Sequence, residues 1–435
     1  MKNVLLLAAQ QRSERFDFFL AVAAVATAIL ISALWAPPAE AQTYSVLYTF
    51  SGREDGAGLR GGGLIMDSAG NLYGTTVAGG QWTYDCSQGC GTIFKMSPSE
   101  SGWAFSTLYR FQGGADGIRP EQVLGFGPVG GLYGTTQEGG EAYGGTVFKL
   151  TPAPTACKAL PCLWTKTVLH QFQGAPEDGS YPTGGSPVFD RAGNLYATTY
   201  FGGTEDAGIV YELQPSAGWQ ETVLQDFTGD NGYFPWSGVV FDDAGNLYGT
   251  TSGGGSSSDG VIFQLTPSPS GWVERVLHSF DYHTEGFQSD GPVVFDHAGN
   301  MYGTTSTGGP GGGGTAWELS PAGDNWSLTV IHVFPGRPLF NDGPYSGLLL
   351  DQAGNLYGTT QFGGAHGWGT VFKLSRSGQG WNYSTLYDFN GDADGAEPDT
   401  QLVMDSKGQI FGATLYGGKY QSFSGFGVIF KISPQ

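Results

Sequence analysis

Apolar residues along this chain fall into short runs separated by glycine-rich turns, and four such runs make up each of seven repeated units. The first run is apolar and ends in aspartate, as in Val239–Asp242 or Leu348–Asp351. A turn of the type Asp-x-Ala-Gly-Asn follows, in which glycine supplies a positive φ and Asp and Asn bond to their own backbone. The second run is Leu-Tyr-Gly-Thr-Thr, so the first two runs predict a β-hairpin.

Two further strands are predicted in each unit. A glycine-rich loop leads to a third run such as Gly369–Leu374, and a Pro/Ser/Gly turn leads to a fourth such as Thr222–Phe227. The first and third runs are apolar without strict alternation, which is typical of strands covered on both faces. Each unit therefore predicts a small four-stranded antiparallel sheet.

The units repeat at intervals of 52–63 residues, and the two longest intervals carry insertions that contain cysteine. A four-stranded unit of this length repeated seven times predicts an all-β, seven-bladed β-propeller over residues 42–435. The aromatic residue of the second run marks each unit, at Tyr73, Tyr133, Tyr196, Tyr248, Tyr302, Tyr357 and Phe411.

The two ends of the repeat region complement each other. Ser45–Phe50 reads as a fourth strand without its own first three, and Gly427–Ile432 reads as a third strand without a fourth. Seven complete sheets result only if the N-terminal strand completes the last blade. That arrangement hides the sheet edges that an open array would expose.

Composition agrees with this fold and narrows the partners. The chain has 435 residues, of which 74 are glycine, and it carries a net charge of −20 that the loss of residues 1–41 would leave unchanged. A negative field repels phosphate backbones and anionic lipid headgroups, so nucleic acid is excluded as a partner. Cations, neutral glycans and basic proteins remain open, and we expect a monomer.

The N-terminus has the pattern of an export signal. Lys2, Arg12 and Arg15 precede an uncharged run over Phe18–Trp35, and Ala39-Glu40-Ala41 follows as a small-x-small cleavage pattern. We expect residues 1–41 to be a signal peptide that is removed, which places the protein in the periplasm or outside the cell with no remaining membrane span. The alternative is an uncleaved anchor, since the run is just long enough to cross a bilayer.

Four cysteines are present, and in an oxidising compartment local disulfides are favoured. The spacing predicts the pairs Cys86–Cys90 and Cys157–Cys162. Neither metal-like spacing nor supporting histidines accompany them, so a cysteine zinc site is not expected.

The repeats resemble the GloVer-type tandem repeat of exported bacterial proteins described as having a choice of anchor. The resemblance is carried by seven segments of the form Asn-Leu-Tyr-Gly-Thr-Thr-x-x-Gly-Gly with Gly-Thr-Val-Phe-Lys-Leu partners. Repeat two departs at Gly127 and Gly131, and repeat seven at Phe411–Thr414. The family implies no established activity. The hairpin also resembles the blades of NHL-like propellers, in which binding is commoner than catalysis.

One position varies while the framework repeats. It lies six residues before the turn aspartate, at the start of the innermost strand, and should therefore rim the central channel. Its residues are Gly61, Glu121, Gly184, Trp236, Asp290, Tyr345 and Asp399. Aromatic faces beside carboxylates suit sugar rings or a cation, so we predict Glu121, Trp236, Asp290, Tyr345 and Asp399 as ligand-binding residues. The alternative is unconstrained surface.

Asp-Gly pairs recur in the loops between blades, at Asp55, Asp116, Asp178, Asp342 and Asp394. They read either as turn residues or as a ring of carboxylates for Ca²⁺, which takes oxygen ligands. The segment Asn390–Gly395 is the best local match to a calcium loop, with Asp392 and Asp394 as ligands, but it lacks a glutamate at the twelfth position.

The histidines give no catalytic pattern. His170, His278 and His332 share one repeat position in the fourth strand, where other units have Tyr or Gln, so we interpret them as structural. None recurs beside Ser or Cys in a way that suggests an activated nucleophile.

Three functions are consistent with these observations. The first is a non-catalytic binding or scaffold module for an extracytoplasmic glycan or protein, without a cofactor. The second is a Ca²⁺-dependent hydrolase or lyase acting on polysaccharide or lactone through carboxylates at the channel mouth. The third is a purely structural envelope module.

Overall fold

Strands account for nearly all the regular structure of the chain. A computed structural model describes residues 42–435 except 62, 129, 153–163, 183, 337–342, 379, 419–424 and 434–435. Contacts divide the chain into Tyr44–Ser433 and a second unit of Met1–Thr43 with Pro434–Gln435. The predicted signal peptide and the predicted Cys157–Cys162 pair lie outside the described residues.

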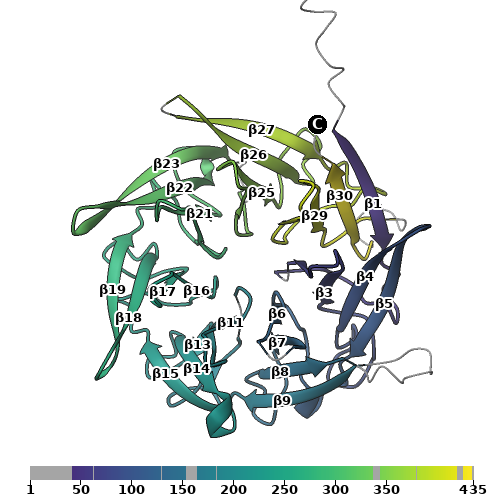
Figure 1. The fold of residues 1–435 in the computed structure, drawn as a ribbon, viewed down its shortest axis with the longest axis horizontal. Helices are drawn as coiled ribbons and strands as arrows, with labels where there is room; N and C mark the ends of the chain where they lie inside the picture. The colour runs from purple at the N-terminus through teal and green to yellow at the C-terminus, as the bar shows by residue number, and fades with distance from the viewer. Residues whose placement is uncertain are drawn as a thin grey trace, which may run out of the picture. The chain divides into compact units, whose positions relative to one another are not determined.

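Within Tyr44–Ser433 the strands form seven four-stranded antiparallel sheets around one axis (Figure 1). Each sheet is called a blade, and its strands are given from the axis outward. Blade 1 comprises β2 (Ile65–Met66), β3 (Leu72–Thr76), β4 (Thr92–Ser99) and β5 (Gly102–Arg110). Blade 2 comprises β6 (Gly125–Phe126), β7 (Leu132–Thr136), β8 (Thr146–Thr151) and β9 (Thr165–Gln171). Blade 3 comprises β11 (Val188–Phe189), β12 (Leu195–Thr199), β14 (Ile209–Gln214) and β15 (Gln220–Asp226).

The remaining blades follow the same order. Blade 4 comprises β16 (Val239–Phe241), β17 (Leu247–Thr250), β18 (Val261–Ser268) and β19 (Gly271–Ser279). Blade 5 comprises β20 (Val294–Phe295), β21 (Met301–Thr305), β22 (Gly312–Ala322) and β23 (Asn325–Pro335). Blade 6 comprises β24 (Leu349–Leu350), β25 (Leu356–Thr360), β26 (Thr370–Ser377) and β27 (Gly380–Asp388). Blade 7 comprises β28 (Val403–Met404), β29 (Ile410–Ala413), β30 (Val428–Ser433) and β1 (Thr43–Thr49).

Short elements complete the described structure. A two-stranded sheet joins β10 (Gly179–Ser180) to β13 (Phe201–Gly202) beside blade 3. Two 3₁₀ turns are present, η1 (Gly114–Asp116) and η2 (Pro215–Ala217). The described part of the chain contains no helix with the length and apolar character that crossing a bilayer requires. The innermost strands have only two or three residues, so they are shorter than the apolar runs that predicted them.

The ring closes as the sequence predicted. Sheet order in blade 7 is β1-β30-β29-β28, so the first strand of the chain is the outer strand of the last blade. The amide of Phe50 donates a hydrogen bond of 3.1 Å to the carbonyl oxygen of Gly427 just beyond the paired strands.

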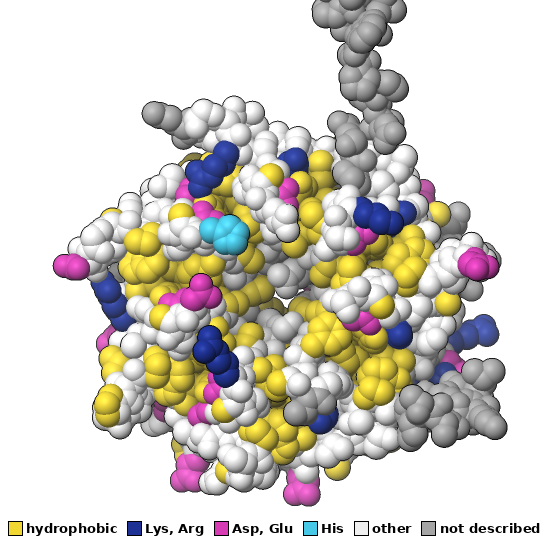
Figure 2. Space-filling model, in the orientation of Figure 1, with side chains coloured by type: hydrophobic (Ala, Val, Ile, Leu, Met, Phe, Trp, Pro, Cys, Tyr) yellow, Lys and Arg dark blue, Asp and Glu magenta, His cyan; other side chains and the backbone are white. Residues whose placement is uncertain are grey.

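On the face seen in Figure 2, charged side chains are scattered among apolar and uncharged ones, and a narrow opening lies near the centre.

In every blade except blade 2 the hairpin turn is tied by one aspartate, which explains the repeated motif. In blade 4, Oδ1 of Asp242 accepts the amides of Ala244 and Asn246, at 2.9 and 2.8 Å. Its Oδ2 accepts Nδ2 of Asn246 at 2.7 Å and the hydroxyl of Tyr248 at 3.0 Å. The same aspartate–asparagine–tyrosine contact occurs at Asp67, Asp190, Asp296 and Asp351.

The glycine of Leu-Tyr-Gly-Thr-Thr makes room for an aromatic ring. Gly358 in β25 pairs with Phe372 in β26, and a Cβ at Gly358 would lie 2.6 Å from Cζ of that ring. Six blades carry a glycine opposite Phe or Trp, and blade 3 instead pairs Ala197 with Tyr211. These rings are fully buried and form the core of each blade.

Neighbouring blades are joined by a three-way contact that recurs around the ring. The first partner lies in the outer strand of one blade. The second is an acidic or amide residue in the loop that follows this strand, and the third lies in the outer strand of the next blade. Between blades 1 and 2, Tyr109 donates to Asp116 at 2.8 Å, and Nζ of Lys166 lies 2.9 Å from the same carboxylate. Between blades 6 and 7, Tyr387 donates to Asp394 at 3.0 Å and stacks on Tyr44 at 3.7 Å.

Candidate ligand site at the channel mouth

One cavity at the axis receives residues from all seven blades. Its volume is about 190 Å³, and its lining includes every residue of the variable repeat position. The structure therefore brings together Gly61, Glu121, Gly184, Trp236, Asp290, Tyr345 and Asp399, as the repeat alignment predicted. Their role in ligand binding stays a prediction.

The loops hold these residues with a fixed backbone conformation. Two residues before the rim position, the chain adopts a positive φ at Arg119, Phe234, Gln288 and Glu397, with φ of 57°, 59°, 58° and 53°. Non-glycine residues adopt this region at a cost of about 1–3 kcal/mol each, and such strain gathers at functional sites. The turn that it produces brings the chain from the outer strand of one blade to the axis.

Aromatic rings on one side of the mouth fix each other. Tyr200 follows β12 and stacks on Phe234, with ring centroids 4.6 Å apart. The ring of Trp236 meets Tyr200 edge to face at 5.1 Å. Offset and edge-to-face pairs of this kind stabilise beyond the area that they bury. Trp236 is therefore held in place at the cavity while its own surface remains partly exposed.

Asp290 faces the cavity from blade 5. Its Oδ1 accepts the hydroxyl of Ser252 at 3.0 Å, and its Oδ2 accepts the hydroxyl of Ser306 at 3.4 Å. Burial raises the pKa of Asp290 to about 6, and the two serine hydrogen bonds only partly oppose that effect. The carboxyl thus changes its charge just below neutral pH.

Asp399 and Glu121 lie in the same acidic environment. Burial raises the pKa of Asp399 to about 7, with Arg60 opposing and Glu121, Asp290 and Glu397 adding to the rise. Burial also raises the pKa of Glu121. Oε1 of Glu121 lies 3.4 Å from Nε of Arg60, whereas its buried Oε2 has no hydrogen-bond partner among the described residues.

Sequence reasoning missed the other residues of this lining, among them Arg60, Tyr200, Ser252 and Gln288. Tyr200 and Ser252 occupy a second variable repeat position, directly after Leu-Tyr-Gly-Thr-Thr or its blade 3 counterpart. Comparison of the repeats at that position would have found them. Arg60 was missed because the loop into blade 1 is one residue longer than the loop into blade 2.

A second cavity of about 720 Å³ lies beside the first and shares Arg60 with it. Its lining includes Arg53, Arg119, Trp82 and Tyr416. Trp82 is 55 % exposed, so its ring is open to a partner. This basic and aromatic surface stands out on a chain with a net charge of −20.

The carboxylates of the Asp-Gly loops are used within the loops. Asp55, Asp116 and Asp178 each accept a backbone amide from their own loop, at 2.8, 2.7 and 2.7 Å. Asp394 accepts the amide of Asn390 at 3.0 Å and the hydroxyl of Tyr387. These contacts support the turn-residue interpretation. Asp342 lies outside the described residues.

The predicted calcium ligands are not joined by a third His, Cys, Asp or Glu side chain in the described part of the chain. There, the one group of three such side chains that could hold a metal ion consists of His170, Asp178 and Glu221, between blades 2 and 3. It includes neither Asp392 nor Asp394, so calcium binding at those residues stays a prediction.

Cys86 and Cys90 form the predicted disulfide, with Cα atoms 5.2 Å apart.

Comparisons with known proteins agree with the repeat architecture. A family model described as the Gloeobacter/Verrucomicrobia repeat matches residues 34–162, 161–338 and 296–435. No curated protein sequence matches the chain.

Two solved structures share the fold at low sequence identity. One is the extracellular domain of a protein assigned as a one component system in B. thetaiotaomicron, with a TM-score of 0.55 and 11 % identity over 91 % of this chain. The other is a fungal alcohol oxidase of the AA5 family in complex with copper, with a TM-score of 0.56 and 14 % identity over 91 % of this chain. The chain spans 40 % of the first protein's length and 77 % of the second's.

Proposed function

Because the chain belongs to the Gloeobacter/Verrucomicrobia repeat family and its seven repeats bring one variable position to a single cavity, we propose that it is a non-catalytic binding protein that takes the end of a glycan at the channel mouth. The observation that carries the proposal is this convergence. The framework residues of each blade repeat, while the residues that face the cavity differ from blade to blade.

The chemistry of the lining suits a sugar. The rings of Trp236 and Tyr345 offer flat apolar faces, and Asp290 and Asp399 offer hydrogen-bonding groups beside them. With pKa values of about 6 and 7, these two carboxyls include both protonated and ionised forms near neutral pH. A protonated carboxyl donates to a sugar hydroxyl and an ionised one accepts from it.

The size of the cavity limits the ligand. Pockets for drug-sized ligands have volumes of roughly 300–1,000 Å³, and the cavity at the axis, at about 190 Å³, is smaller. It suits a single ring rather than a stretch of chain. The neighbouring cavity beside Arg60 offers the exposed ring of Trp82 to the next sugar units, so a chain end is the favoured ligand.

The setting of the protein supports a ligand outside the cytoplasm. The N-terminal pattern predicts export, and the Cys86–Cys90 disulfide is of a kind that persists in oxidising compartments. We therefore place the proposed glycan in the periplasm or outside the cell.

A glycan array with the full-length chain tests the proposal. We expect binding to a set of related glycan ends, and at least a 10-fold loss of affinity for Trp236→Ala and Tyr345→Ala, because each removes a ring from the cavity. Tyr282→Ala is the matched control, since Tyr282 is 43 % exposed and lies outside both cavity linings. Unchanged binding in the two cavity variants would contradict the proposal.

A second candidate is a hydrolase or lyase that acts on polysaccharide or lactone. It is favoured by the pKa values of Asp290 and Asp399, which lie in the range that general acid–base catalysis uses. Turnover assays with and without Ca²⁺ separate the two candidates. Turnover that Asp290→Asn or Asp399→Asn abolishes would favour the enzyme, whereas glycan binding without turnover would favour the binding protein.

A further inference from the structure

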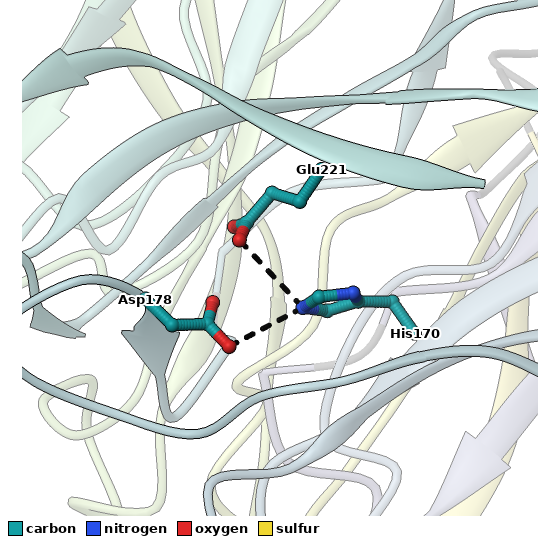
Figure 3. A group of neighbouring side chains, drawn as sticks. All are labelled: His170, Asp178 and Glu221. Carbon is teal, nitrogen blue, oxygen red and sulfur yellow. Dashed lines mark ion pairs between the residues drawn. The ribbon is translucent and has the colours of Figure 1, made fainter. Parts of the chain in front are cut away.

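The junction between blades 2 and 3 gathers three potential metal ligands from three separate segments (Figure 3). His170 lies in β9, Asp178 in the loop after β9, and Glu221 in β15. Nε2 of His170 lies 3.5 Å from Oδ2 of Asp178 and 3.7 Å from Oε2 of Glu221. One ligand atom from each residue lies within 4.8 Å of the other two.

Other junctions hold different groups at these positions among the described residues. Between blades 1 and 2, the ammonium of Lys166 neutralises Asp116. Between blades 3 and 4, Nδ2 of Asn231 donates to Glu274 at 2.8 Å. Between blades 5 and 6, His332 stacks on Tyr383, with ring centroids 4.2 Å apart.

The junction between blades 2 and 3 differs because it places two carboxyl groups beside a histidine. Nε2 of His170 and Oε1 of Glu221 are both buried, and neither has a hydrogen-bond partner among the described residues. Two neighbouring carboxyl groups repel each other when both are ionised in a buried place. A bound cation would relieve that repulsion.

Tyr211 is an independent indication of a polar ligand at this place. Six blades carry Phe or Trp opposite the glycine of the second strand, and blade 3 carries this tyrosine. Its ring is fully buried, and its hydroxyl has no hydrogen-bond partner in the described part of the chain. Tyr211 in β14 pairs with Val223 in β15, two residues from Glu221, so the tyrosine lies beside the strand that carries this carboxyl.

We propose that His170, Asp178 and Glu221 form a binding site for a divalent transition-metal ion of the zinc class, which joins blade 2 to blade 3. Ligand atoms about 2.0–2.2 Å from a tetrahedral zinc ion lie roughly 3.3–3.6 Å from one another. The distance of 3.5 Å from Nε2 to Asp178 falls in that range, and the distance of 3.7 Å to Glu221 lies just above it. The imidazole ligand favours zinc over Ca²⁺, which takes oxygen ligands.

Tyr211 completes the arrangement as a positioning residue. Three protein ligands leave a fourth position on a tetrahedral ion, which water fills. The buried hydroxyl of Tyr211, in the strand paired with the one that carries Glu221, is the group that we assign to bond to that water or to a ligand oxygen. Partners of this kind around a metal site are worth 10–100-fold in affinity.

Metal titration of the full-length, untagged protein tests the proposal. The protein is first stripped with a chelator, the chelator is removed, and zinc is added back. We then expect one bound Zn²⁺ per chain by elemental analysis and a binding signal by calorimetry. Zinc addition should also raise Tm, and the chelator should reverse that rise. His170→Gln and Glu221→Gln should lose the stoichiometric zinc. Gln stands at the position of His170 in blade 3, as Gln225 in β15, so the first variant should keep the fold.

Two further variants sharpen the result. Tyr211→Phe introduces the residue that most blades carry there, and we expect a 10–100-fold weaker zinc affinity with the fold intact. His332→Gln is the matched control, because His332 has the same repeat position but meets Tyr383 where His170 meets Glu221, and it should bind zinc like the wild type. Absence of stoichiometric zinc in the wild type, or its retention in folded His170→Gln, would overturn the proposal.

Discussion

The hydroxyl of Tyr248 lies 3.0 Å from Oδ2 of Asp242, six residues earlier in the chain, and this contact closes the inner hairpin of blade 4. Because the same oxygen also accepts Nδ2 of Asn246, one carboxylate satisfies the turn and anchors the second strand. The repeated sequence motif is therefore a repeated hydrogen-bond network rather than a packing pattern alone.

Loss of this contact should lower stability by a modest amount. Tyr248→Phe removes one hydrogen bond to a charged acceptor, and we expect the free energy of unfolding to fall by about 1.5–3 kcal/mol in urea unfolding. Tyr133→Phe is the control, because Gly127 stands where blade 2 would need the aspartate. An equal loss in both variants would contradict the role assigned to Asp242.

The network should also fail in acid. Burial works to raise the pKa of Asp242, but the hydrogen bonds from Asn246, Tyr248 and the backbone outweigh it and lower the pKa below its ordinary value. A carboxyl with a lowered folded-state pKa stabilises the fold above its unfolded pKa of about 4 and loses that contribution as the pH falls. Between pH 5 and pH 2, Asp242→Asn should therefore show a smaller loss of stability than the wild type.

Asp399 should give the opposite pH dependence. Burial raises its pKa to about 7, so the folded protein retains a proton that the unfolded chain releases near pH 4. The Asp399 carboxyl should therefore lower the free energy of unfolding of the wild type as the pH rises from about 4 to 7, by at most about 1.4 kcal/mol per pH unit. Unfolding of Asp399→Asn across this range should lack that slope. Parallel curves for the two proteins would refute the assignment.

Ring closure depends on the packing of Phe50 between the first and last blades. Its side chain is fully buried and meets Phe94 edge to face at 5.4 Å. Phe50→Ala should cost about 3–5 kcal/mol in chemical unfolding, as for other buried aromatic residues. Val46→Ala in the same region of the chain should change stability by less than about 0.5 kcal/mol, because Val46 is exposed.

Much of this architecture followed from the repeats. The number of blades, the four strands and the pairing of β1 with β30 were all predicted, because a turn motif such as Asp242–Asn246–Tyr248 fixes both its own hairpin and the register of its unit. The innermost strands were expected to be longer. Their ends are set by loops that converge on the axis, which a run of apolar residues does not reveal.

The sites were only partly predictable. Counting back from the turn aspartate found Asp290 and Asp399, because the loops that lead into blades 5 and 7 have equal length. It missed Arg60, because the loop that leads into blade 1 has one more residue. His170, Asp178 and Glu221 were not grouped by any sequence spacing. Their proximity comes from the packing of one outer strand against the loop and outer strand of its neighbours, which is a property of the ring.

The pairing of β1 with β30 has a consequence for synthesis and transport. The first strand to leave the ribosome must stay unpaired until almost the last residue has been added, so no nascent chain can attain the native topology. Contacts this distant in the chain also form slowly. If the chain is exported as its N-terminal pattern predicts, it remains open while it is threaded across the membrane, and it acquires resistance to unfolding only once β1 and β30 are on the same side.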